Sequence, residues 1–205
     1  MKKHKMDLFP KLQLVVEQLL EVNDERRVIL QALIDYIQEK KNNEEEVNLN
    51  FICTHNSRRS QFSQIWAQTA ADFYGISAQC FSGGVEVTAF NERAVASMRR
   101  LGFDVSSIGE GNPQYTVKYN NQSSGIVSYS KLFNDLSSPV VNFSAVMTCS
   151  HADENCPVIP GTEKRIAVRY EDPKAYDDTS LEEAKYDERS LEIASEMFYV
   201  FSEIK

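Results

Sequence analysis

The sequence predicts an α/β fold: a three-layer, doubly wound, four-stranded parallel sheet with an N-terminal helical hairpin and a β-hairpin insertion. From residue 47 onward, short apolar runs alternate with amphipathic segments, the pattern of a parallel sheet with helices on both faces. Residues 7–41 carry helical periodicity without a strand. A polar stretch at 109–139 breaks the alternation and has the signature of a hairpin. The length of 205 residues suits one domain of ordinary size plus an extension.

Each element of the main domain follows from its periodicity and its end signals. VNLNFIC, SAQCFS, FSAVMTC and RIAVRY are runs of strand length, and the segments between them place apolar residues at helical spacing. One helix ends at Gly102, a residue type common just after a helix. The predicted strands are 47–53, 77–82, 143–149 and 165–170, and the predicted helices are 60–74, 89–101 and 179–202.

The N-terminal segment is expected to form two helices. The polar turn VNDE between them offers Asn23 or Asp24 as a cap. Such a pair could dock on the main domain, form a homodimer surface or bind a partner. EKKNNEEE at 39–46 reads as a solvated linker, so that an extension over 1–46 precedes a main domain over 47–205. The expected apolar stripes are Leu8, Leu12, Val15, Val16, Leu19 and Leu20 on the first helix, and Val28, Ile29, Leu33, Ile34 and Ile37 on the second.

The insertion at 109–139 contains PQYTVKYNNQSSGIVSYSK. Two runs of alternating polarity flank the polar turn NNQSSG, which predicts a β-hairpin near the loops of the main domain.

Composition excludes several classes of function. The net charge is −8 and the pI is near 5.0, which argues against general affinity for nucleic acid or anionic membranes. No apolar run approaches the ~18 residues of a membrane span. The N-terminus MKKHKMDLF lacks the apolar core of a signal peptide. A cytoplasmic location is therefore expected, where the four cysteines would be thiols at rest.

The segment FICTHNSRRSQ at 51–61 carries the first candidate site. A strand that runs through a short loop into a helix N-terminus gathers free backbone N–H groups, which together bind an oxyanion. Thiols in such positions ionise readily, so Cys53 is a candidate nucleophile. The planar fork of Arg59 suits two oxygens of a tetrahedral anion. Alternatively, Cys53 fills space at a strand end and the two arginines are solvated. The candidate oxyanion-binding residues are Thr54, His55, Asn56, Ser57, Arg58, Arg59 and Ser60.

Two further cysteines lie in MTCSHADENCPVIPG at 147–161. Cys149 ends a predicted strand, and Cys156 follows after six residues. This spacing is too long for a thioredoxin-type pair, and a zinc site would need two more ligands where only His151 is near, so no metal is expected. Two inert cysteines are one interpretation. The other is a loop whose second cysteine forms a transient disulfide with the first.

RYEDPKAYDD supplies the third element. Asp172 precedes Pro173 directly after the fourth predicted strand, at the sheet edge where catalytic loops gather. A carboxylic acid there could protonate a leaving oxygen, although a turn aspartate before proline is common without any function.

Taken in order, these motifs resemble a known family. Cys-Thr-His-Asn-Ser-Arg-Arg-Ser-Gln at 53–61 resembles the active-site loop of low-molecular-weight protein tyrosine phosphatases, and more closely that of the thioredoxin-coupled arsenate reductases with the same fold. FSGGVEVTAFNERAVASMRRLGFDVS at 81–106 is similar to the second strand and helix of that family. Cys-Ser-His-Ala-Asp-Glu-Asn-Cys-Pro at 149–157 resembles the redox segment of the arsenate reductases, and Asp172-Pro173 matches the general-acid loop. The resemblance covers about 47–205 except the insertion.

Three positions depart from the family pattern. His55 stands where the family usually has glycine, which adds a side chain and a titratable donor. Arg58 stands where many members have a second cysteine. Gln64 stands where some reductases have a glutamate that supports the loop.

The resemblance implies a thiol-dependent arsenate reductase. Cys53 attacks arsenate, Asp172 protonates the departing oxygen, Cys149 attacks Cys53, and Cys156 attacks Cys149. An external reductant such as thioredoxin then reopens the disulfide, and no bound cofactor is implied. The alternative is a phosphatase that hydrolyses phosphotyrosine or small phosphate esters through a phosphocysteine. A third hypothesis is a non-catalytic oxyanion-binding or redox-sensing module. Cys80, on the second predicted strand, is expected to be core packing.

Overall fold

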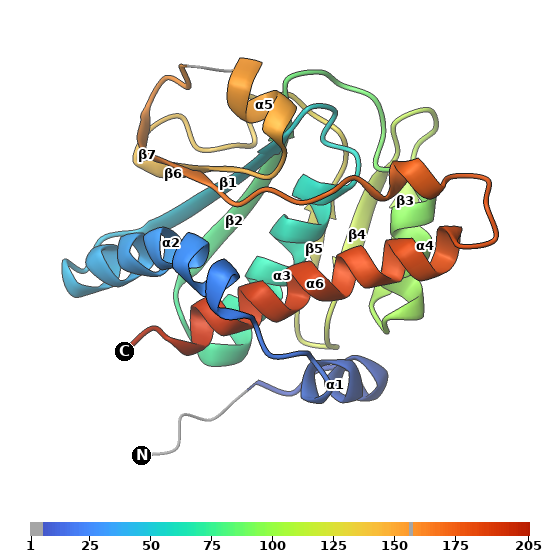
Figure 1. The fold of residues 1–205 in the computed structure, drawn as a ribbon, viewed down its shortest axis with the longest axis horizontal. Coiled ribbons are helices and arrows are strands. Elements are labelled where there is room, and N and C mark those ends of the chain that lie inside the picture. Colours follow the sequence, from blue (N-terminus) through green and yellow to red (C-terminus); the bar gives the residue numbers. More distant parts are fainter. Residues whose placement is uncertain (1–5, 156–157) are drawn as a thin grey trace.

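The central sheet of the molecule is parallel throughout and has four strands in the order β2-β1-β6-β7 (Figure 1). The computed structural model describes residues 6–155 and 158–205, so Cys156 lies outside the described residues. The order places β1 at the centre, between the strand that follows it and a strand nearly a hundred residues later. This confirms the predicted fold class. The strands are β1 (Val47–Cys53), β2 (Ala78–Gly84), β6 (Phe143–Met147) and β7 (Thr162–Ala167).

One face of the sheet packs against the long helices. Leu49, Phe51 and Val146 point to this face and belong to a single large hydrophobic cluster with the helices. Its centre is aromatic: the ring of Trp66 meets Phe103 edge-on at a centroid distance of 4.9 Å, and meets Phe198 at 6.2 Å. The helices in this layer are α2 (Asp24–Asn42), α3 (Arg59–Tyr74), α4 (Glu92–Arg100) and α6 (Glu182–Ser202).

The other face has a smaller cover. Ile52, Ala145 and Met147 alternate with the residues above and form a second cluster with the short helix α5 (Ser150–Asn155). The chain that leaves the insertion also lies here, because the side chain of Asn50 donates to the carbonyl oxygen of Phe133 at 2.9 Å. Since α5 follows β6 directly, it sits at the carboxyl end of the sheet (Figure 1).

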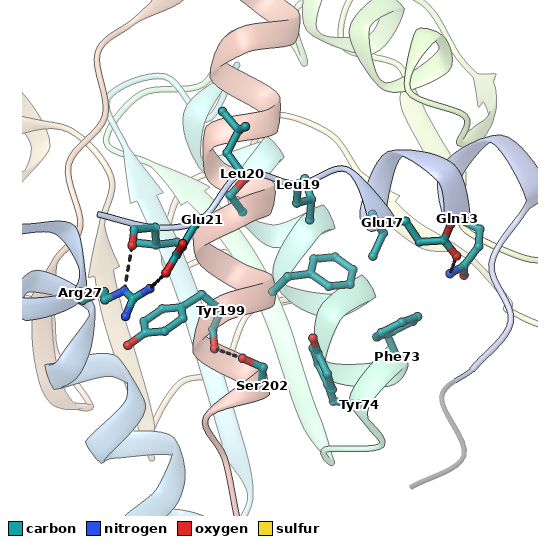
Figure 2. A pocket seen from close by; sticks show the side chains of 14 residues that line it. Gln13, Glu17, Leu19, Leu20, Glu21, Arg27, Phe73, Tyr74, Tyr199 and Ser202 are labelled. Atoms are coloured by element: carbon teal, nitrogen blue, oxygen red, sulfur yellow. Dashed lines mark hydrogen bonds and ion pairs between the residues drawn. The ribbon is translucent and has the colours of Figure 1, made fainter. Parts of the chain in front are cut away.

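The N-terminal helices dock on this body. Leu12 of α1 (Pro10–Glu17) and Leu30 and Leu33 of α2 are fully buried in the same cluster as the sheet. Asn23 caps α2, as one of the two predicted alternatives, by accepting from the backbone N–H of Arg26 at 2.9 Å. The segment between the helices is tied to α2, because Arg27 donates to the carbonyl oxygen of Val22 and to the carboxylate of Glu21 (Figure 2).

Parts of the expected apolar stripes were wrong. Leu20, Val28 and Ile29 are exposed, at 82%, 76% and 40%. The first helix ends at Glu17 instead of continuing through Leu20, and the buried stripe of α2 begins at Leu30. Periodicity alone could not place these ends, because leucine and valine occur on both sides of them.

The expectation of a solvated linker at 39–46 was right for the exposed residues 43–46 and wrong for 39–42. Residues 39–42 belong to α2, and Lys40 is buried with its ammonium held by Glu45 at 2.6 Å and Glu163 at 2.7 Å. The hydroxyl of Tyr36 donates to the second oxygen of Glu163 at 2.8 Å. The charged end of α2 is therefore bonded to Glu163 of β7. Local sequence does not reveal this contact because the two segments are far apart in the chain.

The insertion contains the predicted hairpin within a larger sheet. β4 (Gln114–Lys118) and β5 (Ile126–Ser128) pair antiparallel, and β3 (Asp104–Ile108) adds a third strand alongside β4. β3 was missed because its sequence DVSSI is polar and largely exposed. Gly125, which has a φ of +90°, precedes β5 at a position where an added Cβ would lie 2.5 Å from Thr116.

Several predicted boundaries shift by a few residues. β7 covers 162–167 instead of 165–170, and β6 ends at Met147 instead of Cys149. α4 begins at Glu92 instead of Ala89, because the side chain of Asn91 accepts from the backbone N–H groups of Arg93 and Ala94. Within 6–155 and 158–205, no helix is long and apolar enough to cross a membrane.

The buried Lys40 gives a stability prediction. Lys40→Met should lower the free energy of unfolding by about 1–3 kcal/mol, because Glu163 and Glu45 lose a charged partner in a partly buried place. Urea unfolding measures it. Lys11→Met, at an exposed lysine of α1, is the matched control and should leave the midpoint unchanged. Equal midpoints for both variants would contradict the assignment.

Candidate active site

The candidate site lies at the carboxyl end of the parallel sheet. β1 and β6 are neighbours with Ile52 opposite Met147, so Cys53 and Cys149 leave the sheet at the same edge. The chain after β7 reaches the same edge, where Asp172 begins a short 3-10 helix over Pro173–Tyr176. The three sequence motifs therefore converge because their strands are parallel.

Cys53 is buried, and its sulfur lies 3.0 Å from the hydroxyl oxygen of Ser60. The same hydroxyl oxygen accepts a hydrogen bond from the side-chain amide of Asn56 at 2.9 Å. Ser60 therefore joins the sulfur of Cys53 to the side-chain amide of Asn56, which fixes the position of the sulfur at the start of the loop.

Asn56 holds the loop in shape. Its φ is +46°, a left-handed conformation that asparagine tolerates better than most residues. Its side-chain oxygen accepts from the backbone N–H of Lys131, which fixes the orientation of the amide. Gln61 donates to the carbonyl oxygens of Asn56 and Tyr129, each at 2.9 Å. Gln61 was quoted in the motif but not assigned a role, because a glutamine on a helix carries no signal without its partners.

The backbone N–H groups of residues 55–60 are available for an anion. Among the described residues, none of them donates a hydrogen bond to another group. They precede or begin α3, a helix of 16 residues, so its dipole adds to their positive potential. A concavity lined by such groups binds oxyanions.

The guanidinium of Arg59 is held by two hydrogen bonds that leave its Nε unpaired within the described part of the chain. It donates to a carboxylate oxygen of Asp172 at 2.8 Å and to the carbonyl oxygen of Tyr170 at 3.2 Å. Its Nε is buried and has no partner among the described residues. An unpaired buried donor is costly unless a ligand meets it, so this atom is suited to an oxygen of a bound anion.

Tyr170 is itself held by a network that sequence reasoning missed. Its hydroxyl donates to Glu196 of α6 at 2.6 Å, and Arg26 of α2 donates to both oxygens of the same carboxylate at 2.5 and 2.8 Å. Arg26 also donates to the carbonyl oxygen of Arg169. The N-terminal extension thereby supports the backbone against which Arg59 rests.

The side chains of Arg58, His55 and Ser57 contact residues outside the loop. Arg58 donates to the hydroxyl of Tyr186 at 2.8 Å and lies 3.6 Å from Asp177, and burial together with Asp177 raises the pKa of Tyr186. His55 faces Glu86 at 3.3 Å. Ser57 donates to the carbonyl oxygen of Ala89 at 2.7 Å.

Gln64 is buried, and its side chain connects α3 to β2. It donates to the carbonyl oxygen of Cys80 and accepts from the hydroxyl of Ser82. Cys80 is buried on β2, and burial, with the charge of Asp72, raises the pKa of its thiol. A thiol in that condition is a poor nucleophile, in agreement with the packing role expected for Cys80.

Cys149 lies one side chain away from the candidate nucleophile. It is buried, and its sulfur accepts from the backbone N–H of Ala152 at 3.4 Å. The hydroxyl of Thr54, the residue after Cys53, contacts the same sulfur at 3.5 Å. The third cysteine of the predicted relay, Cys156, is outside the described residues. No group of three or more His, Cys, Asp or Glu in 6–155 and 158–205 could hold a metal ion.

The helix α5, which begins directly after Cys149, is held by a clamp of ion pairs. Asp153 accepts from Arg165 at 2.9 Å and from Arg169. Burial alone would raise the pKa of Asp153, but the hydrogen bonds from Arg169 and Arg165 outweigh it and hold the pKa below its usual range. The clamp is therefore intact above the ordinary carboxyl range, near pH 4, and is lost as the pH falls through the lowered value.

Release of this clamp should expose Cys149. In a chain whose other three cysteines are serine, we expect Asp153→Asn to raise the rate of Cys149 alkylation by iodoacetamide several-fold at pH 7. The cause is the loss of the charge that binds α5 to Arg165 and Arg169. Glu154→Gln, at the exposed neighbouring carboxylate, is the matched control. Equal rates for the two variants would show that Asp153 does not hold α5.

Together, the parallel sheet and the loop around Cys53 define a cysteine-based enzyme that acts on oxyanions. No protein-family model matches the chain. It is 32% identical over 124 residues to arsenate reductase 2 of Staphylococcus epidermidis, which covers 60% of this chain and 76% of the relative. An arsenate reductase of Staphylococcus aureus gives 32% over 125 residues with the same coverage.

The chain belongs to the arsenate reductase family. Among solved structures, a low-molecular-weight protein tyrosine phosphatase from T. tengcongensis shares the fold. It has a TM-score of 0.50 and 14% identity, and covers 74% of this chain and 95% of that one.

Proposed function

We propose that the protein is a thiol-dependent arsenate reductase. The observation that carries this proposal is the placement of two buried thiols, Cys53 and Cys149, at the ends of adjacent parallel strands, where the hydroxyl of Thr54, the residue after Cys53, lies 3.5 Å from the sulfur of Cys149. A hydrolase needs the first thiol only. Reduction of arsenate by two electrons needs a second thiol that can reach the first.

In the first step, the Cys53 thiolate attacks arsenate held by the loop amides and Arg59. A sulfur–arsenic bond forms and one oxygen leaves as water, protonated by Asp172. Asp172 is suited to this task because Arg59 holds it beside the place where the anion would lie.

In the second step, Cys149 attacks the sulfur of Cys53. A disulfide forms while the sulfur–arsenic bond breaks with its electron pair on arsenic, so arsenate leaves as arsenite. Cys156 then attacks Cys149, releases the Cys53 thiolate and leaves a Cys149–Cys156 disulfide. We infer that an external thiol reductant such as thioredoxin reopens this disulfide, in a cytoplasmic compartment that keeps thiols reduced. A homodimer through the N-terminal helices stays a prediction.

The rival function is a phosphatase that uses Cys53, Arg59 and Asp172 without the other thiols. The pairing of Arg59 with Asp172 serves that chemistry equally well. Both functions share the first step, so slow hydrolysis of an aryl phosphate agrees with either. Only the dependence on Cys149 and Cys156 separates them.

Cysteine variants test the proposal. Arsenite formation with reduced thioredoxin should fall by about 10⁴-fold or more in Cys53→Ser, because the nucleophile is lost. Cys149→Ser and Cys156→Ser should lose arsenite turnover while they keep the aryl phosphate hydrolysis of the wild type.

Cys80→Ser is the matched control, because this buried thiol lies on β2 and has no role in the relay. Its arsenite turnover should equal that of the wild type. Fast hydrolysis of phosphotyrosine by the wild type, with no arsenite formed, would establish the rival function instead.

A further inference from the structure

Three side chains form a row beside the nucleophile. His151 Nδ1 lies 3.2 Å from the hydroxyl oxygen of Thr54, which lies 3.5 Å from the sulfur of Cys149. His151 is exposed on α5, whereas Cys149 is buried. The row thus connects a buried thiol to an imidazole at the surface. The steps proposed above require Cys149 as a thiolate but assign no group to take its proton.

The hydroxyl in the middle suits the transfer of a proton. A threonine hydroxyl donates one hydrogen bond and accepts two. When His151 is neutral with Nδ1 unprotonated, Thr54 donates to Nδ1 and can accept from the thiol of Cys149. After the proton has moved, both hydrogen bonds reverse: the imidazolium donates to Thr54, and Thr54 donates to the thiolate. The row is hydrogen-bonded in both states.

We propose that His151 accepts the proton of Cys149 through the hydroxyl of Thr54 as Cys149 attacks Cys53. The proton of Cys149 passes to Thr54, and the hydroxyl proton of Thr54 passes to His151. The sulfur of Cys149 is then free to form the disulfide while arsenite departs from Cys53. Solvent takes the proton from the exposed imidazole afterwards. This inference rests on the proposed function, and His151 is a positioning residue that acts through Thr54.

The other titratable groups around α5 are buried thiols, paired ions or exposed carboxylates. α5 packs on β1 and β6, and the thiols at this end are Cys53, the last residue of β1, and Cys149, two residues after β6. Asp153, on the same helix, is bound by Arg165 and Arg169 from the side of β7, and Glu154 is exposed. At the loop, the other imidazole, His55, is paired with Glu86, and Arg59 is paired with Asp172.

The test follows a single turnover in the full chain carrying Cys156→Ser, which stops at the Cys53–Cys149 disulfide. Disulfide formation is measured by quenching after mixing with arsenate between pH 5.5 and 8.5. With His151, the rate should rise from pH 5.5 and reach a plateau once the imidazole is neutral. His151→Asn keeps an oxygen that can accept from Thr54 but cannot hold a proton. It should be roughly 100-fold slower at neutral pH, with a rate that keeps rising tenfold per pH unit.

Two controls separate proton transfer from a change in structure. Aryl phosphate hydrolysis, which needs Cys53 but not Cys149, should be the same with and without His151→Asn. Thr54→Val should slow disulfide formation, and adding His151→Asn to it should cost nothing further, because the row is already broken. A plateau and rate unchanged in His151→Asn, or full additivity with Thr54→Val, would overturn the proposal.

A measurement without arsenate keeps this inference separate from the proposed function. In a chain with serine at 53, 80 and 156, the thiolate absorbance of Cys149 at about 240 nm is titrated. His151→Asn should move the midpoint upward, because the thiolate loses the imidazolium end of the row. No shift would overturn the relay, even if arsenate is reduced. A shift in a chain that forms no arsenite would support the relay and reject the proposed function alone.

Discussion

The parallel pairing of β1 with β6 is the constraint on which the site depends. Ile52 lies opposite Met147, and this register brings two cysteines that are 96 positions apart in the chain to one sheet edge. The carbonyl oxygen of Ile52 fixes that register further by accepting from both the backbone N–H and the hydroxyl of Thr148. A slip of one residue would turn Cys149 to the opposite face of the sheet. The chemistry of two thiols therefore rests on a ladder of backbone hydrogen bonds.

Around that ladder, each reactive group is oriented by a neighbour. Asn56 donates to the hydroxyl oxygen of Ser60, which contacts the sulfur of Cys53, and Asp172 with the carbonyl oxygen of Tyr170 fixes Arg59. These contacts are formed before any anion arrives, so binding costs little reorganisation. The unpaired Nε of Arg59 and the free loop amides are left as donors in a protein whose net charge is −8. The positive potential is local, as an anion site in an acidic protein must be.

The N-terminal extension contributes to this order. α2 lies between α6 and the end of β7, where Arg26 holds Glu196 and, through it, Tyr170. Lys40 makes a second connection to the start of the same strand through Glu163. The extension thus holds both ends of β7. The chain that leaves the carboxyl end of β7 leads to Asp172. This gives two helices outside the family resemblance a direct physical link to the site.

Local sequence determined much of the fold and the candidate site. The alternation of strands and helices predicted the parallel sheet, and the C-x5-R pattern after a strand predicted the anion-binding loop. Both patterns could be recognised because they depend on residues only a few positions apart. β3 was not predicted because its sequence is polar. The last turn of α2 was assigned to a linker because it is rich in charge, and the start of α4 was placed too early because the cap formed by Asn91 was not recognised. Partners distant in sequence decided those features, and they also decided the roles of Gln61, Glu196 and Arg26.

By itself, the sequence determined which residues can act as nucleophile, anion ligand and acid, since these roles follow from side-chain chemistry. Only the tertiary structure decided which of them meet. It brought Thr54 between Cys149 and His151 and set Arg59 against Asp172. The physical reason is that strand register and helix packing act between segments about a hundred residues apart, where a local pattern carries no information.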